Sequence, residues 1–230
     1  MTLYKKIYLL FLMITLAFSS STLFAEPKFP ATPDAEVSWV GKNLEYNDMP
    51  MRLRKVTSED SVEGVLKFYR ELWEKPLLEN VPGHIEQDLA GWKMITRPED
   101  GYMMSVQVKP YLGSGAWGYL GISKIDDLDA NVELGSSFPK MNGSQVMNDV
   151  KHNDSVKKAR TVMLQNKYSL ATNVQYYRDH YTGRGWNKVM DRTAVPGKLH
   201  TFVFKKGTNE VSMTVARTGN GSQVVANVIE

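Results

Sequence analysis

Apolar residues recur at helical spacing in two similar segments of the chain. In residues 61–73, SVEGVLKFYRELW, they follow the three-and-four spacing of an amphipathic helix. Residues 169–181, SLATNVQYYRDHY, repeat this pattern and place YYR at 176–178 where the first segment has FYR at 68–70. Each segment opens with a serine, a residue that is favoured at the N-cap of a helix. The sequence therefore predicts one helix in each segment.

Alternating apolar and polar residues predict strands around each helix. One such segment precedes the helix in each copy, and the others follow it, separated by turn sequences such as PEDG and TGNG. This order predicts an α+β fold: two tandem modules, each with one helix packed on a small antiparallel sheet, in the order strand, helix, strand, strand, strand. The predicted strands are 51–56, 92–96, 102–111 and 117–125, then 160–165, 186–191, 199–206, 210–217 and 223–229.

The similarity of the two copies extends beyond the helices. Gly91-Trp92 follows the first helix and Gly185-Trp186 follows the second, while Asn47-Asp48 recurs 106 residues later as Asn153-Asp154. We predict that the Asn-Asp pairs form turns before the first strand of each module. Residues 75–90 have no evident counterpart in the second copy, which makes them either a functional loop or a tolerated surface insertion.

The unit S-x(6)-[FY]-Y-R followed by G-W resembles one that recurs in exported proteins of Gram-negative bacteria, often without an assigned activity. The resemblance covers both halves of the chain. It implies a location in the cell envelope and supplies no catalytic residue.

The first 25 residues have the pattern of a secretory signal peptide. Lys5 and Lys6 precede the apolar run 7–18, and Ala25 is a small residue suited to precede a cleavage site. We expect the leader to be cleaved and the protein to be periplasmic or secreted. The alternative is an uncleaved leader, and only in that case do we expect contact with the membrane. The predicted domains are the signal peptide 1–25, a first module 26–125, a linker 126–138 and a second module 139–230.

Charge and cysteine content narrow the classes of function. The chain has 28 basic and 25 acidic residues, and loss of Lys5 and Lys6 leaves 26 against 25. A nearly neutral domain lacks the basic field of nucleic-acid-binding proteins, so we expect no nucleic-acid partner. The absence of cysteine from the sequence excludes disulfides, thiolate metal sites and the acylated cysteine of a bacterial lipoprotein.

The sequence contains none of the common catalytic or cofactor motifs. The four histidines lie in different segments and form no H-E-x-x-H motif, and neither G-x-S-x-G nor a Gly-Lys-Ser/Thr phosphate loop occurs. Adjacent carboxylates such as Glu99-Asp100 fall in predicted turns, where they make poor acid–base pairs. We therefore predict no metal, no cofactor and no enzymatic activity.

The candidate binding residues lie on the repeated helices. Phe68 and Tyr176 fall off the apolar stripe, so either they contact a partner or another part of the chain covers them. Arg70 and Arg178 lie near the edge of the stripe, where a guanidinium group reaches the carboxylate of a partner or lies along its own sheet.

Two similar modules without a catalytic constellation favour recognition in an extended or bivalent mode. The leading hypothesis is a non-catalytic periplasmic binding or assembly protein whose partner is another cell-envelope component, most simply a protein of secretion, pilus or outer-membrane assembly. Two alternatives stay open: a carrier of a small apolar ligand or lipid, with Trp92, Trp117 and Trp186 in its pocket, and a hydrolase of envelope polymers that uses carboxylates. The oligomeric state stays open as well.

Overall fold

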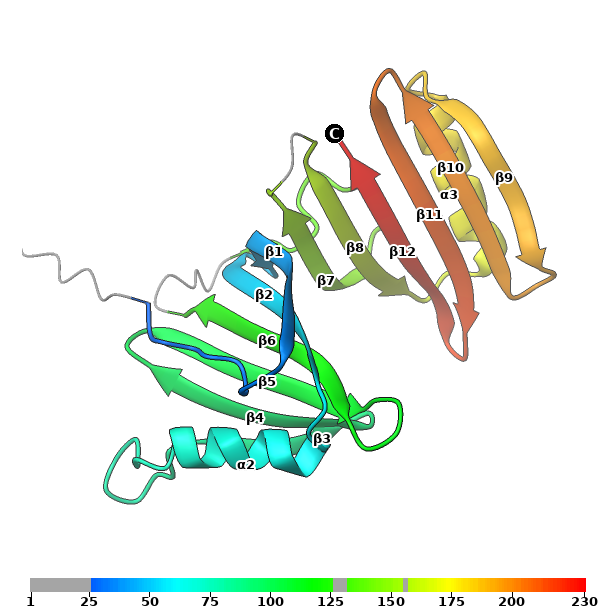
Figure 1. The fold of residues 1–230 in the computed structure, drawn as a ribbon. Coiled ribbons are helices and arrows are strands. Elements are labelled where there is room, and N and C mark those ends of the chain that lie inside the picture. Colours follow the sequence, from blue (N-terminus) through cyan, green and yellow to red (C-terminus); the bar gives the residue numbers. More distant parts are fainter. Residues whose placement is uncertain (1–25, 126–131, 155–156) are drawn as a thin grey trace, which may run out of the picture.

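The computed structural model describes residues 26–125, 132–154 and 157–230. The predicted signal peptide lies outside these residues, as does the first part of the predicted linker. Twelve strands form one antiparallel sheet, and the described residues contain two short helices (Figure 1). The prediction of an α+β fold, with two modules that each pack one helix on a small antiparallel sheet, is therefore wrong, because the protein has a β-rich fold. The sequence does not show whether the two modules share a sheet, and the structure joins all twelve strands in one.

The two halves of the chain, residues 26–125 and 132–230, contain the same elements in the same order. The first half has β1 (Glu36–Tyr46), β2 (Met49–Ser58), α2 (Val62–Leu72), β3 (Ile85–Leu89), β4 (Trp92–Glu99), β5 (Tyr102–Pro110) and β6 (Ala116–Lys124). The second half has β7 (Gln145–His152), β8 (Ala159–Asn166), α3 (Leu170–Thr182), β9 (Asn187–Val195), β10 (Leu199–Lys206), β11 (Asn209–Thr218) and β12 (Gly221–Ile229). From its outer edge inward, the sheet runs β3-β4-β5-β6-β2-β1 in the first half and β9-β10-β11-β12-β8-β7 in the second. The duplication in the sequence therefore includes the whole topology.

Three strands, β1, β3 and β7, were not predicted from the sequence pattern. β3 is exposed at all five of its positions, so it shows no alternation of buried and exposed residues. It lies within residues 75–90, pairs with β4 and corresponds to β9, so this segment does have a counterpart in the second half. The two Gly-Trp pairs are not equivalent, because Gly91-Trp92 leads into β4 whereas Gly185-Trp186 leads into β9.

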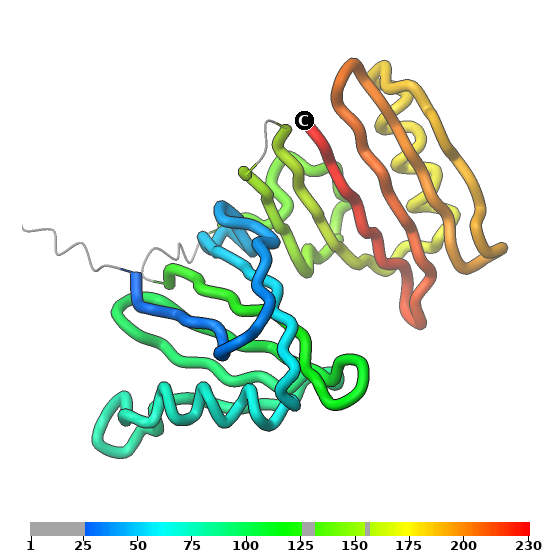
Figure 2. Tube along the Cα trace, viewed as in Figure 1, coloured from blue at the N-terminus to red at the C-terminus, as the bar shows by residue number. Residues whose placement is uncertain are grey.

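β1 bends along its length. Register shifts on both sides of Gly41 interrupt its pairing with β2, and a Cβ atom at Gly41 would clash with the side chain of Leu44. The bend lets β1 pair with β2 over most of its length and with β7 at its end, at the centre of the molecule (Figure 2). Asn47-Asp48 joins β1 to β2 with φ angles of 51° and 67°, so the predicted turn is confirmed, but it leads into the second strand of the half and not the first.

β1 and β7 join the two halves with local two-fold symmetry. By the sheet register Leu44 and His152 are equivalent positions, because Leu44 pairs with Met51 of β2 and His152 pairs with the equivalent Ala159 of β8. Leu44 and His152 also pair with each other. A position that faces its own equivalent is the property of a two-fold interface between identical subunits. The three pairs of the junction are Leu44↔His152, Glu45↔Lys151 and Tyr46↔Val150.

Backbone hydrogen bonds flank the Glu45–Lys151 pair on both sides. The Asn47 N–H donates to the Asp149 carbonyl at 2.8 Å, and the Asn153 N–H donates to the Asn43 carbonyl at 3.0 Å. The side chains of the pair have opposite charge, and Lys151 Nζ lies 2.6 Å from the Glu45 carboxylate. Opposite charges on facing residues stabilise the pairing of β1 with β7.

Each half has its own core between its helix and the sheet. The side chains of Ser61 and Ser169 accept hydrogen bonds from first-turn N–H groups at 3.1 and 3.0 Å, so both predicted helices and their caps are confirmed. Tyr69 and Tyr177, at equivalent helix positions, are fully buried in these cores. Phe29, from the segment before β1, adds to the first core, with its ring centroid 6.0 Å from that of Tyr69.

Candidate functional site

The two arginines predicted as binding residues are engaged within the protein. Arg70 of α2 donates to both carboxylate oxygens of Glu86 on β3, at 2.6 and 2.8 Å. Arg178 of α3 donates to both carboxylate oxygens of Asp191 on β9, at 2.8 and 3.0 Å. These hydrogen bonds raise the pKa of both arginines. Each arginine therefore ties its helix to the outer strand of its own half.

Phe68 and Tyr176 lie beside the core tyrosines. Phe68 meets Tyr69 edge-on with ring centroids 5.0 Å apart, and Tyr176 meets Tyr177 in the same way at 5.0 Å. Both side chains are partly buried, and each packs against the core of its own half. Their role as contacts for a partner stays a prediction.

Asp191 is the centre of a polar cluster in the second half. Besides binding Arg178, it lies 3.0 Å from Lys188 Nζ and 2.7 Å from His200 Nε2, and its side chain is 9% exposed. His200 Nδ1 lies 3.1 Å from Thr193 Oγ1. The pKa of Asp191 lies well below its usual range, chiefly because of the hydrogen bond from Arg178, which together with those from Lys188 and His200 outweighs the opposing effect of burial.

The order Thr193, His200, Asp191 resembles a hydroxyl–imidazole–carboxylate relay, and inspection of the sequence missed it. The available signal was alternation, since Asp191 and Thr193 lie on one face of β9 and the register places His200 opposite Thr193. In a catalytic triad the carboxylate serves the imidazole. Here Arg178 and Lys188 share the charge of that carboxylate. We interpret the cluster as a structural link between α3, β9 and β10.

The sheet face of the first half that points away from α2 is called the open face below. Val108 and Leu120 pack beneath α2 in the first core, so their strand neighbours Lys109 and Tyr119 point to the opposite side. The open face therefore carries side chains that the helix does not cover.

Aromatic and basic residues gather on this open face. The ring centroids of Trp92, Trp117 and Tyr119 lie 5.3 to 5.9 Å apart. Lys109 Nζ lies 4.6 Å from the ring centroid of Trp92 and 4.7 Å from that of Trp117, and Lys55 Nζ lies 5.9 Å from the Trp117 centroid. The strand register brings them together, because Lys109 pairs with Trp117 and Lys55 pairs with Tyr119. These five residues are called the platform, and its three aromatic side chains are partly exposed.

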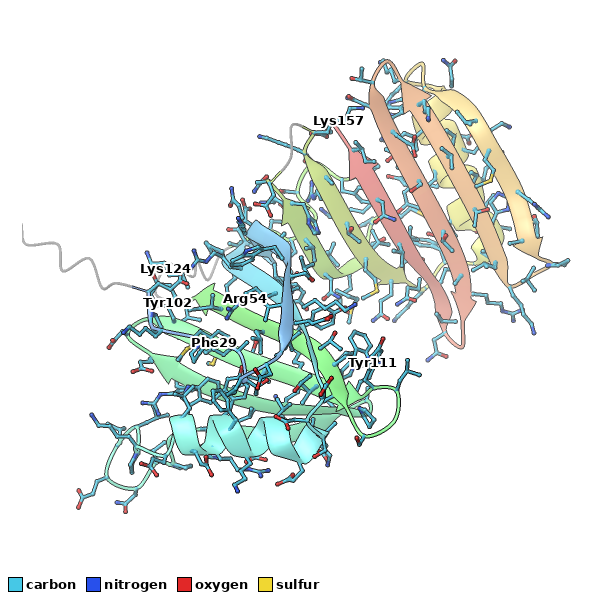
Figure 3. All side chains as sticks on the ribbon, in the orientation of Figure 1. Phe29, Arg54, Tyr102, Tyr111, Lys124 and Lys157 are labelled. Carbon is cyan, nitrogen blue, oxygen red and sulfur yellow. The ribbon has the colours of Figure 1, made fainter. Side chains whose placement is uncertain are left out.

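Apolar side chains extend the platform along the sheet. Ile85 and Leu89 of β3 are 54% and 61% exposed, and Leu89 pairs with Trp92. Tyr111 follows β5 and is also exposed, beside the hairpin that leads to β6 (Figure 3). The first half thus presents a surface that is both apolar and basic.

The equivalent positions of the second half have different chemistry. Topology and register relate the platform to positions on β8, β10, β11 and β12. None of the residues there is aromatic or charged. For Trp92, Lys109, Trp117, Tyr119 and Lys55 in turn, the equivalents are Leu199, Ala216, Gln223, Val225 and Met163. The third tryptophan of the predicted pocket, Trp186, packs 5.3 Å from Tyr181 in the second core, so the structure separates it from the platform.

A groove of about 400 Å³ lies beside the junction of the two halves, with His152 and Asp154 in its lining. Arg160 on its wall donates to both carboxylate oxygens of Asp149, at 2.7 and 2.6 Å. Burial disfavours the charge of Asp149, but the hydrogen bonds from Arg160 and from the Gly135 N–H outweigh this effect and lower the pKa of the carboxyl. The charge of Arg160 is therefore compensated within the protein.

In the part of the chain that the structure describes, no group of three or more His, Asp or Glu residues is arranged to hold a metal ion. No helix among those residues has the length and apolar character needed to cross a membrane. No protein-family model matches the chain, and no curated protein or solved structure is significantly similar to it. The resemblance to exported Gram-negative proteins therefore stays an expectation.

Proposed function

We propose that this protein is a non-catalytic, exported binding protein that attaches through the platform to another protein of the bacterial cell envelope. The signal-peptide pattern and the resemblance to exported Gram-negative proteins support a periplasmic location. The observation that carries the proposal is the platform itself, in which three partly exposed aromatic side chains lie next to two lysines on the open face.

Recognition accounts for the aromatic residues better than folding does. A folded chain gains stability when indole rings are buried, and partial exposure of two of them forgoes part of that gain. The second half has the same topology with Leu199, Gln223 and Val225 at the equivalent positions, so the scaffold does not require aromatic residues there. Trp and Tyr are the residue types that contribute most to binding when a partner covers them.

Site-specific photo-crosslinking in the native host tests this proposal. A photoreactive amino acid at Gln107, which pairs with Tyr119 on the open face, is expected to give a discrete adduct with an envelope protein. The same amino acid at Thr214, the equivalent position of the second half, is the matched control and is expected to give none. Equal adducts at both positions, or none at Gln107, would contradict the proposal.

Replacement of four of the five platform residues by those of the second half gives a complementary test. The variant Trp92→Leu, Lys109→Ala, Trp117→Gln, Tyr119→Val introduces side chains that the same topology already accommodates, so the fold is expected to persist. We expect the adduct at Gln107 to disappear while the far-ultraviolet circular dichroism spectrum stays the same. Persistence of the adduct in this variant would exclude the platform as the binding surface.

The helix residues predicted from the sequence require a separate variant. Phe68→Ala with Tyr176→Ala removes both aromatic side chains next to the cores. If the adduct at Gln107 survives in this variant, the binding surface is confined to the open face. Loss of the adduct with an unchanged circular dichroism spectrum would extend the surface to the helices.

A further inference from the structure

We propose that the platform binds an acidic segment of its partner polypeptide. This inference rests on the proposed function, because it specifies the chemistry of the partner at the same surface. It follows from the distribution of charge on the open face, from the position of Lys109 and from the apolar side chains of Ile85 and Leu89 on β3.

The open-face positions of β2 to β6 contain two lysines and no carboxylate. Among the described residues, neither Lys55 nor Lys109 forms an ion pair, and their close contacts are with aromatic rings. The next carboxylate on this face of the sheet belongs to Glu36, which lies on β1, the strand beside β2, and pairs with Thr57. A surface with uncompensated positive charge attracts an anionic partner and repels a cationic one.

Lys109 is positioned by the two indole rings that flank it. Its Nζ lies at nearly equal distances, 4.6 and 4.7 Å, from the ring centroids of Trp92 and Trp117. Cation–π contacts of this kind orient the ammonium group, and they leave its N–H donors able to bond an anion. A side chain that is already ordered loses less conformational entropy on binding. Lys109 is therefore a preorganised donor for a carboxylate.

The aliphatic side chains beside the platform favour a polypeptide over an acidic polysaccharide as the partner. Ile85 and Leu89 pair with Thr96 and Trp92, so they continue the open face to the outer edge of the sheet. A peptide that has apolar side chains among its acidic residues covers this aliphatic surface while its carboxylates reach the lysines. Sugar hydroxyl groups placed on the same aliphatic surface would lose water without gaining hydrogen bonds.

Titration of the purified protein with a fluorescent copolymer of glutamate and tyrosine, poly(Glu,Tyr), tests this chemistry. Poly(Lys,Tyr) is the control with reversed charge, and polygalacturonate is the control with the same charge but no apolar side chains. We expect poly(Glu,Tyr) to bind most tightly, and its affinity to fall as ionic strength rises, because exposed charge contacts are screened by salt. Tighter binding of poly(Lys,Tyr) would overturn the inference, and tighter binding of polygalacturonate would replace it with an acidic glycan.

Matched charge variants show whether the lysines of the platform are responsible. Lys55→Met with Lys109→Ala, which introduces the residues of the second half, is expected to weaken poly(Glu,Tyr) binding about tenfold. Lys198→Ala with Lys205→Ala removes the same charge from the second half and is expected to leave the affinity nearly unchanged. Equal losses in the two variants would show an effect of net charge alone and overturn the inference.

The in-cell adduct at Gln107 separates failure of this inference from failure of the proposed function. If the adduct survives Lys55→Met with Lys109→Ala but is lost in Trp92→Leu with Trp117→Gln, the proposed function stands and the acidic chemistry is wrong. If Gln107 gives no adduct even without these substitutions, the proposed function fails as well.

Discussion

The two halves of the molecule share their helix-side cores but not their open faces. Beneath the helices, a buried tyrosine and an arginine–carboxylate pair recur at equivalent positions. On the sheet faces that point away from the helices, the first half has the platform, while the second half has small, aliphatic or amide side chains at the equivalent positions. The comparison indicates that the fold depends on the helix side, which leaves the other side of each half free to diverge.

The largest difference in stability is expected between the two carboxylates that bind the helix arginines. Asp191→Asn should lower the free energy of unfolding by about 3 kcal/mol, because Arg178, Lys188 and His200 lose their shared anionic acceptor in a mostly buried site. Glu86→Gln should lower it by less than about 1 kcal/mol, because the Glu86 side chain is 35% exposed and water can replace it. Urea unfolding of both variants measures the difference, and similar losses would show that the two clusters are energetically alike.

Acid should reduce the difference between wild type and Asp191→Asn. The hydrogen bond from Arg178 lowers the pKa of Asp191 in the folded protein, so the stability that this carboxylate contributes is complete above its unfolded-state pKa of about 3.9. That contribution is lost as the pH falls through the folded-state pKa. We expect the two unfolding free energies to approach each other below about pH 4. A difference that stays constant into strong acid would contradict this assignment.

Transfer of four of the five platform residues to the second half is expected to create a second binding surface. The variant Leu199→Trp, Ala216→Lys, Gln223→Trp, Val225→Tyr should raise the number of poly(Glu,Tyr) sites per chain from one to two, with the new site within about tenfold of the native affinity. Isothermal titration calorimetry measures the stoichiometry. An unchanged stoichiometry in a folded variant would show that the open face of the second half differs in more than its side chains.

Loss of the hydroxyl group should destabilise the protein at Tyr69 but not at the equivalent Tyr177. Tyr69 donates to the Pro30 carbonyl at 2.9 Å, whereas the buried hydroxyl of Tyr177 has no hydrogen-bond partner among the described residues. Tyr69→Phe should lower the free energy of unfolding by about 1 kcal/mol, and Tyr177→Phe should leave it unchanged or raise it by up to about 1 kcal/mol. Thermal unfolding of both variants tests the contrast, and a loss of stability in Tyr177→Phe would point to a hydrogen bond at its hydroxyl.

Charge reversal at the junction of the halves is expected to have the smallest effect. Glu45→Lys should lower the free energy of unfolding by up to about 1 kcal/mol, because two lysines then face each other across β1 and β7. Lys151→Glu should cost more, since Lys151 also lies 3.2 Å from Asp48. The double variant Glu45→Lys with Lys151→Glu places opposite charges across the junction again, so part of the loss should be recovered. Recovery should be incomplete because the new carboxylate then lies near Asp48. Full additivity of the two single effects would show that the side chains do not interact.

The sequence pattern was sufficient for the helices and insufficient for the sheet. Helical spacing and the capping serines are local features, so both helices could be predicted. The joining of the halves depends on β1 and β7, which pair over more than 100 residues of sequence and over only three residue pairs. β1 is interrupted by register shifts at Gly41, and β3 is exposed at every position, so neither has the regular alternation that marks a strand.

The candidate site was partly encoded in the sequence. Trp117 and Tyr119 alternate with the buried Gly118 and Leu120, which is the signature of a two-faced strand. The sequence leaves a pocket as one alternative for the tryptophans, because alternation does not show whether another element covers a face. Arg70 and Arg178 were identified as an equivalent pair, but their partners lie on strands whose pairing with the rest of the sheet is not evident from local pattern.

The two-fold relation between β1 and β7 has a consequence for stoichiometry. A dimer of identical subunits displays each of its surfaces twice, so one assembly is able to bridge two partner molecules. In this chain the two halves are joined in the same way, but the platform is present on one of them. Under the proposed function, one platform per chain predicts one bound partner segment per chain, which suits a protein that caps or anchors a single envelope component and not one that cross-links several.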